Sequence, residues 1–162
     1  MMLISPPQPY KFWLRTRDRD PELLPLVNRH YYRKAIRNPR QDFVGPGRSI
    51  VLRTPKADAV FIWLWAKPEM REDKLDCYYC VAFRNESGCL SSAMIREAMH
   101  VAIEVWGPPL KDGFVTYVDP SKVQSPNPGY CFLKAGWRRL GKSKTGKILL
   151  QAKGDGQIPS TS

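Results

Sequence analysis

The stretch "DCYYCVAFRNESGCLSSAMIREAMHVAIEVWG", residues 76–107, gives the clearest structural pattern in the sequence. Residues 76–84 form an apolar and aromatic run of strand length. Across residues 94–106 the apolar side chains recur every three or four positions, which predicts a helix with one face in the core. Ser91 or Ser92 is expected to cap that helix, and the Gly-Pro pair after it ends the helix. The stretch therefore predicts a strand followed by the main helix of the protein.

The flanking segments extend this pattern on both sides. Apolar runs bounded by Pro, Gly and polar residues predict further strands, and capping signals or helical spacing predict two further helices. A meander followed by a strand-helix-strand unit implies an α/β protein with a mixed sheet and helices on its faces. The expected strands are 11–15, 49–54, 59–67, 113–119 and 147–152, and the expected helices are 23–35 and a short one ending at Gly136.

The composition is that of one basic domain. The chain has 162 residues, with 26 Lys and Arg against 15 Asp and Glu, a net charge of +11. A positive field of this size favours polyanions, above all nucleic acid. No apolar run approaches the roughly 18 residues of a membrane helix, and the prolines of "MMLISPPQPYK" interrupt any secretory signal. We therefore expect a soluble, cytoplasmic protein.

Two of the four cysteines, Cys77 and Cys80, form a C-x-x-C motif. Such a motif is typical of zinc or redox sites. On a strand, however, residues three apart point to opposite faces of the sheet. Cys89 and Cys131 are not spaced as a second zinc pair. We therefore predict that all four are plain apolar cysteines.

Two clusters of basic residues are candidates for phosphate contacts. The first lies in "LVNRHYYRKAIRNPRQDF" at residues 26–43, and the second follows Trp137. Solvated surface side chains are the alternative interpretation of each. The clusters are Arg29, Arg33, Lys34, Arg37 and Arg40, and Arg138, Arg139, Lys142, Lys144 and Lys147.

The first cluster also contains candidates for catalysis. On helical spacing, His30 and Tyr31 share a face with Leu26, whereas the arginines lie on another face. An imidazole that titrates near neutral pH suits a general base or a metal ligand, and a buried structural histidine is the alternative. Tyr31 is either a proton donor, a stacking platform or a core residue. Asn28 either takes part in catalysis or ties the helix to its neighbour.

Three further positions suggest a ligand at the ends of strands. Arg84 follows an apolar strand and needs an anion, either a ligand or Glu86 or Glu97. Ser91 and Ser92 open the main helix, where hydroxyl and backbone N–H groups hold anions. Asp119 ends a strand, which indicates either a ligand site or the start of a turn.

The segment "NPGYCFLKAGWRRLGKSKTGK" at residues 127–147 resembles the closing motif of the GNAT acyltransferase superfamily. The resemblance implies a GNAT-like fold over residues 1–152, with 153–162 as a flexible tail, and an acyl-CoA donor held at the start of the main helix. The segment "FRNESGCLSSAM" departs from the glycine-rich donor loop of that superfamily. This departure weakens the case for a conventional acetyltransferase.

A narrower resemblance joins "VNRHYYRK", "FRN…LSSAMI" and "VD…NPGYCFLKAGW". Together they resemble the bacteriophage GNAT-like DNA modification proteins related to Mom. The resemblance implies a transferase that places a carbamoylmethyl-like group on a base of double-stranded DNA, such as the N6 amine of adenine. Such modification protects phage DNA from restriction in the host cytoplasm.

The same resemblance implies roles for individual residues. It makes His30, Tyr31, Asp119 and Asn28 catalytic and Arg84, Ser91 and Ser92 donor-binding, and His30 with Asp119 would hold iron if a metal takes part. It leaves open the donor, acetyl-CoA or a related one, and the oligomeric state. Phe132 stands where the family has a tyrosine, so that hydroxyl is missing. A base extruded from the duplex needs an aromatic pocket, for which the candidates are Tyr31, Trp63, Trp65, Tyr79 and Trp137.

Two alternatives belong to other classes. The first is an acetyl-CoA-dependent N-acetyltransferase acting on a small amine, a protein or a modified thymidine. The second is a non-enzymatic, basic DNA-binding protein built on a GNAT fold, which the unusual donor loop favours.

Overall fold

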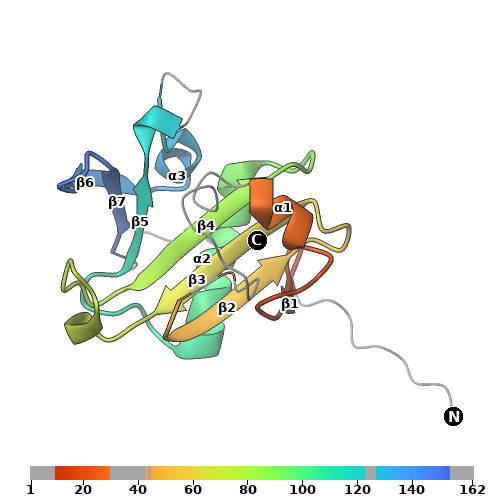
Figure 1. The fold of residues 1–162 in the computed structure, drawn as a ribbon, viewed down its shortest axis with the longest axis horizontal. Coiled ribbons are helices and arrows are strands. Elements are labelled where there is room, and N and C mark those ends of the chain that lie inside the picture. Colours follow the sequence, from red (N-terminus) through yellow and green to blue (C-terminus); the bar gives the residue numbers. More distant parts are fainter. Residues whose placement is uncertain (1–9, 30–42, 44, 123–126, 154–162) are drawn as a thin grey trace, which may run out of the picture.

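The computed structural model describes residues 10–29, 43, 45–122 and 127–153. Within these residues the chain forms a seven-stranded sheet in the order β1-β2-β3-β4-β5-β7-β6, with helices on its faces (Figure 1). The strands are β1 (Leu14–Thr16), β2 (Arg48–Arg53), β3 (Ala59–Trp65), β4 (Tyr78–Asn85), β5 (Phe114–Val118), β6 (Arg138–Lys142) and β7 (Ile148–Ala152). The helices are α1 (Leu24–Arg29), α2 (Ser91–Trp106) and α3 (Tyr130–Lys134), and the 3₁₀ turns are η2 (Pro68–Met70) and η3 (Pro120–Lys122).

The sheet is mixed, as the sequence predicts. In the described part of the chain β4 and β5 pair in parallel, and every other neighbouring pair is antiparallel. The parallel pairing runs only from Tyr78 opposite Phe114 to Cys80 opposite Thr116. Beyond that point β4 continues to Asn85 while β5 turns away from it (Figure 1). The two strands therefore separate toward their carboxyl ends.

The larger part of the core lies between the sheet and α2. Alternate residues of β3, β4 and β5 point toward α2, among them Trp63, Tyr78 and Phe114, which are fully buried. The Trp63 Nε1 donates a hydrogen bond to the Ala98 carbonyl at 2.8 Å, and the Tyr78 hydroxyl donates to the Gly107 carbonyl at 3.0 Å. These bonds satisfy the polar ends of large aromatic side chains inside the core.

The opposite face of the sheet is covered by α1 over a smaller area. Leu26 and Val27 of α1 are buried against Val60 and Ile62, which alternate along β3 with the residues under α2. The helix predicted for residues 23–35 is seen as Leu24–Arg29, and residues 30–35 lie outside the described part. Of the tail predicted for residues 153–162, residues 154–162 also lie outside it.

The main helix is confirmed at Ser91–Trp106, but the prediction of its cap is wrong. Leu90 is the N-cap residue, and no side chain caps the helix. Ser91 and Ser92 occupy the first helical positions instead, and the Ser91 hydroxyl accepts a hydrogen bond from the Asn85 Nδ2 at 2.9 Å. Asn85, in the segment before α2, thus binds the Ser91 hydroxyl that was predicted to cap the helix.

The strand β6 is absent from the predicted element order. All five of its residues are exposed, because it is the edge strand of the sheet and pairs only with β7. It therefore lacks the apolar alternation by which half-buried strands are recognised.

Both cysteines of the C-x-x-C motif are buried, as we expect of apolar cysteines on a strand. Cys77 and Cys80 are free thiols, and both are buried. Cys80 lies in the core under α2, whereas Cys77 lies on the other side of the sheet near Arg71 and Asp73. Burial is the main cause that raises the pKa of Cys77 to about 12, so it stays protonated at neutral pH.

Candidate functional site

The carboxyl end of β4 leads directly into α2 through a loop organised by Asn85. The Asn85 Nδ2 donates to the Cys89 carbonyl at 2.8 Å as well as to the Ser91 hydroxyl, and its Oδ1 accepts from the Ser87 N–H at 2.9 Å. The first N–H groups of a helix have no partners within the helix, and among the described residues no side-chain hydrogen bond caps this end of α2. This end of α2 therefore presents backbone donors just beyond the carboxyl end of β4, the strand that separates from β5 after Cys80.

Arg84 forms the ion pair that the sequence offers as an alternative to ligand binding. Its Nε donates to Glu86 at 2.6 Å, and its Nη1 donates to the Arg29 carbonyl at 3.1 Å. The Arg29 guanidinium also binds Glu86 through two hydrogen bonds, at 3.0 and 2.8 Å. Hydrogen bonds from Arg29 and Arg84 lower the pKa of Glu86 to about 2. The three side chains thus fix the end of α1 to the end of β4, and Arg84 as a donor-binding residue remains a prediction.

Asp119 lies just after β5 and makes the turn that was its alternative role. Its Oδ1 accepts hydrogen bonds from the Ser121 N–H at 3.0 Å and from the Ser121 hydroxyl at 2.6 Å. These bonds, with smaller contributions from Lys122 and Lys147, lower the pKa of Asp119. The carboxylate is therefore charged at neutral pH and adjoins the turn between β6 and β7.

The predicted catalytic residues of the first basic cluster are only partly described. Asn28 is exposed on α1, and His30 and Tyr31 lie outside the described residues. The residue before them, Arg29, is held at the carboxyl end of β4, and Asp119 lies at the carboxyl end of β5. Since these two strands are parallel, both positions lie at the carboxyl ends of the strands, on the same side of the sheet's strand pairings.

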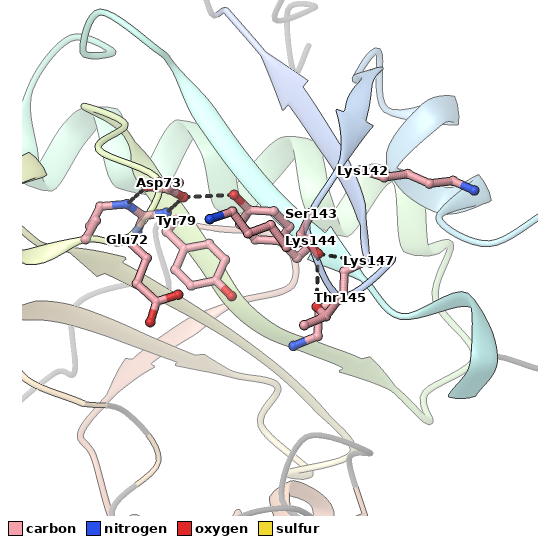
Figure 2. A pocket seen from close by; sticks show the side chains of 10 residues that line it. Glu72, Asp73, Tyr79, Lys142, Ser143, Lys144, Thr145 and Lys147 are labelled. Carbon is pink, nitrogen blue, oxygen red and sulfur yellow. Dashed lines mark hydrogen bonds and ion pairs between the residues drawn. The ribbon is translucent and has the colours of Figure 1, made fainter.

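A pocket of about 560 Å³ opens on the sheet face opposite α2 (Figure 2). Tyr79 of β4 and Tyr117 of β5 form one wall, with ring centroids 6.0 Å apart and ring planes at 79°. Residues of the turn between β6 and β7 line the same pocket. The lining residues are Arg71, Glu72, Asp73, Tyr79, Tyr117, Lys142, Ser143, Lys144, Thr145 and Lys147.

The tyrosine wall is held by a chain of polar contacts. Arg71 binds Asp73 through two hydrogen bonds, at 2.7 and 2.5 Å, and its guanidinium carbon lies 4.8 Å from the centre of the Tyr79 ring. The Tyr117 hydroxyl donates to the Asp73 Oδ2 at 2.9 Å (dashed in Figure 2). Burial first, and then Asp73, raises the pKa of Tyr117 to about 12, so its phenol remains a donor at neutral pH.

The facing rim is a short basic turn with its own hydrogen bonds. The Ser143 N–H donates to the Lys147 carbonyl at 2.8 Å, and the Lys147 N–H donates to the Ser143 hydroxyl at 3.1 Å. Lys142, Lys144 and Lys147 are exposed, and Lys142 points away from the other labelled side chains in Figure 2. Asp73 neutralises the charge of Arg71. The other charged residues of the lining are Glu72 and the lysines of the rim, so the lining as a whole is positively charged.

The structure separates the aromatic candidates for a base pocket. Trp63 and Trp137 are buried in the core under α2 and do not line the pocket, because they lie on the other face of the sheet. Trp65 packs against Trp106 on that same face, whereas Tyr79 lines the pocket. Tyr117 was not predicted, although the alternation of "FVTYVD" indicates that it faces away from the core.

Of the two basic clusters, the second is fully described. Arg138 is exposed on β6, and the Arg139 Nη2 donates to the Asn127 Oδ1 at 2.9 Å. In the first cluster Arg29 is engaged with Glu86, and the other members lie outside the described residues. The undescribed members are Arg33, Lys34, Arg37 and Arg40.

A metal site is not formed within the described residues. They contain no group of three or more His, Cys, Asp or Glu side chains placed to hold an ion. Of the two proposed iron ligands only Asp119 is described, and it contacts Ser121 rather than another acidic or imidazole group.

The uncapped start of α2 and Asp119 lie beyond the carboxyl ends of the separating strands β4 and β5, whereas the tyrosine pocket lies nearer the amino end of β4, where Tyr79 and residues 71–73 line it. In the described part of the chain, no helix combines the length and apolar character needed to span a bilayer. Comparisons of the chain with protein-family models, with curated proteins and with solved structures gave no match.

Proposed function

We propose that the protein is a GNAT-like transferase that moves an acyl-derived group from a donor onto a base in DNA, as the resemblance to the phage DNA modification proteins implies. The observation that carries the proposal is the separation of β4 from β5, together with the uncapped start of α2 beyond the carboxyl end of β4. It supports a donor inserted between the strands, and the pocket on the opposite face supports an acceptor that arrives from the other side.

The donor side offers backbone groups rather than a glycine-rich loop. Within the described residues β4 does not pair with β5 beyond Cys80, which suits hydrogen bonds between this edge of β4 and an extended ligand. The N–H groups at the start of α2 and the positive end of the helix dipole favour an anionic group of the donor. Ser91 lies at this end, and Asn85 fixes its hydroxyl.

The acceptor side offers a charge and an aromatic wall. Transfer to an amine forms a new bond from nitrogen to the donor carbon, breaks the donor's bond to its carrier, and releases one proton from the amine. Asp119 stays ionised at neutral pH, which suits orienting an exocyclic amine better than accepting its proton. In this proposal proton transfer belongs to His30 and Tyr31, which follow Arg29 in the chain.

The direct test is nuclease digestion and mass spectrometry of DNA from cells that express the protein. A nucleoside of increased mass is expected, and unmodified DNA in cells that supply the donors would overturn the proposal. His30→Ala is expected to abolish modification while circular dichroism shows the fold retained. Full activity of that variant would remove His30 from the mechanism.

A matched pair of variants separates the two roles of Asp119. Asp119→Asn keeps an oxygen that accepts the Ser121 bonds but removes the charge, whereas Ser121→Ala keeps the charge and removes a turn contact. If the carboxylate orients the acceptor, Asp119→Asn loses activity and Ser121→Ala keeps most of it. The reverse pattern would reduce Asp119 to a turn residue.

Two other functions have support from single features. The uncapped helix start suits a conventional acetyl-CoA-dependent acetyltransferase, which saturable acetyl-CoA binding in calorimetry without DNA affinity would indicate. The exposed basic strand β6 suits a non-enzymatic DNA-binding protein. Its mark would be DNA affinity with steep salt dependence, unchanged by Asp119→Ala.

A further inference from the structure

The pocket between the tyrosines and the β6–β7 turn has two chemically different sides. One side consists of the Tyr79 and Tyr117 rings, which come from two adjacent strands and lie on the face opposite α2. The other side carries Lys144 and Lys147 on an exposed turn. A ligand that fits both sides has a flat apolar part and an anionic part.

The aromatic side is preorganised. Arg71 has only 9% of its side chain exposed and Asp73 has 19%, and their ion pair joins the Tyr117 hydroxyl to the guanidinium over Tyr79. The Arg71 charge is therefore neutralised within the wall rather than offered to a ligand. A wall whose rings are already fixed loses little conformational freedom when it binds.

The basic side is continuous with the edge of the sheet. Within the described residues, Lys144 and Lys147 form no ion pair, and the turn that carries them is fixed by the bonds between Ser143 and Lys147. Arg138 and Lys142 extend the positive surface along β6, every residue of which is exposed. This arrangement suits a chain of phosphates better than a single anion.

We propose that this pocket binds one unpaired nucleotide of a nucleic acid strand, with its base against Tyr79 and Tyr117 and its phosphates on Lys144 and Lys147. A paired base has both faces covered by its neighbours, so only a base in a single strand or extruded from a duplex reaches two ring walls. A volume of about 560 Å³ lies within the usual range for a ligand of nucleotide size. An acidic peptide would use the lysines but leave the tyrosine wall without a partner.

DNA would thus enter the site with one nucleotide unpaired. Binding of this nucleotide can be tested by itself, whereas its later modification rests on the proposed function. It is tested by fluorescence anisotropy with three labelled probes: a single-stranded oligonucleotide, a fully paired duplex, and the same duplex with one unpaired central base. The intact protein is expected to bind the first and third probes more tightly than the second. Equal affinity for all three probes would overturn the proposal.

The aromatic side is tested at Tyr79. Tyr79→Leu is expected to weaken single-strand binding by about five- to hundredfold, the usual effect of removing one aromatic ring on which a base stacks. Tyr79→Phe keeps the ring and is expected to retain the affinity of the wild type. Stacking on the ring would be contradicted if both variants lost binding at an unchanged thermal midpoint. It would also be contradicted if neither variant lost binding.

The basic side is tested by charge reversal with a matched control. Lys144→Glu and Lys147→Glu are each expected to lower the affinity and to reduce the slope of log Kobs against log salt by about 0.7 for each phosphate that the variant no longer neutralises. Lys56→Glu changes the charge equally on the exposed turn between β2 and β3 and is expected to leave the slope unchanged. Equal effects of all three variants would show a general field rather than a site.

Two further outcomes separate this site from other occupants and from the transfer reaction. Competition by poly-glutamate that depends on Tyr79 would assign the pocket to an acidic peptide and overturn the proposal. Tyr79-dependent oligonucleotide binding in a protein that leaves cellular DNA unmodified would support the pocket and defeat the proposed transferase. DNA modification that is unaffected by Tyr79→Leu would support the transferase and defeat the pocket.

Discussion

The two faces of the β4–β5 pair differ in what their side chains do. Tyr78 is fully buried toward α2, where it packs against Trp106 and Phe114 and donates to the Gly107 carbonyl. Its neighbour Tyr79 points to the other face and forms a wall of the pocket. Because successive residues of a strand alternate between faces, one short segment serves the core and the site at once.

Polar groups follow the same division. On the α2 face the buried Glu97 carboxylate accepts hydrogen bonds from the backbone N–H groups of Lys11, Phe12 and Trp13 at 2.8–3.1 Å. Within the described residues, no buried side-chain nitrogen or oxygen lacks a hydrogen-bond partner. On the pocket face the lysine side chains are exposed instead. The α2 face is thus closely packed around β4 and β5, whereas the part of the opposite face that lines the pocket carries exposed charged side chains.

The largest contrast is expected between Tyr78 and Tyr79. Tyr78→Ala leaves a cavity among packed rings and is expected to lower the free energy of unfolding by about 3–5 kcal/mol. Tyr79→Ala removes a half-buried ring and is expected to cost about 1–2 kcal/mol. Urea denaturation monitored by tryptophan fluorescence measures both. Equal losses would mean that the two faces are packed alike.

The next contrast is between Glu97 and Glu72. Glu97→Ala leaves three backbone N–H groups without their acceptor and is expected to lower the free energy of unfolding by about 2–3 kcal/mol. Glu72→Ala removes an exposed acid at the pocket and is expected to change it by less than about 0.5 kcal/mol. The same denaturation experiment measures both changes. A large loss for Glu72→Ala would show that side chains on the pocket face also stabilise the fold.

A substitution of Gly113, the residue directly before β5, tests the strand register on which both faces depend. Gly113 has a φ of +67°, and a Cβ there would lie 2.2 Å from the Ala152 carbonyl oxygen. Gly113→Ala is therefore expected to cost about 1–3 kcal/mol, since neither the backbone of β7 nor the left-handed conformation accommodates it. Gly88→Ala, with nothing within 4 Å of its Cβ, is the matched control and is expected to be nearly neutral. An equally stable Gly113→Ala protein would contradict the described pairing of β5 and β7.

The smallest expected effect is at Glu86, on the exposed edge that joins α1 to β4. Its pKa is lowered from 4.5 to about 2 in the folded protein, so its stabilising contribution is complete above pH 4.5 and is lost as the pH falls through about 2. Glu86→Gln is expected to lower the free energy of unfolding by at most about 1 kcal/mol at neutral pH, because the pair is exposed. The difference from wild type should vanish near pH 2 and shrink in high salt. A difference that grows in acid would contradict the ion pairing with Arg29 and Arg84.

Much of the fold was predictable from local patterns. The helical spacing of residues 94–106 and the apolar runs at 59–67 and 76–84 predict α2, β3 and β4 to within a few residues. The exposed strand β6 was missed, because an edge strand with charged side chains on both sides leaves no hydrophobic period. The cap of α2 was predicted wrongly because Asn85, six residues before Ser91, determines where the serine hydroxyl is used.

For the candidate site, the sequence indicated which types of residue are present more reliably than which residues contact one another. Composition and periodicity are local properties, so the sequence alone was enough to predict a basic α/β chain, a central strand-helix unit and polar groups at the ends of the strands. The tertiary structure decided that Tyr117 joins Tyr79, that Glu86 rather than Glu97 meets Arg84, and that the β6–β7 lysines face the tyrosine wall. The contacts that build the pocket join segments far apart in the chain, and they follow from strand order and register, which no single segment encodes.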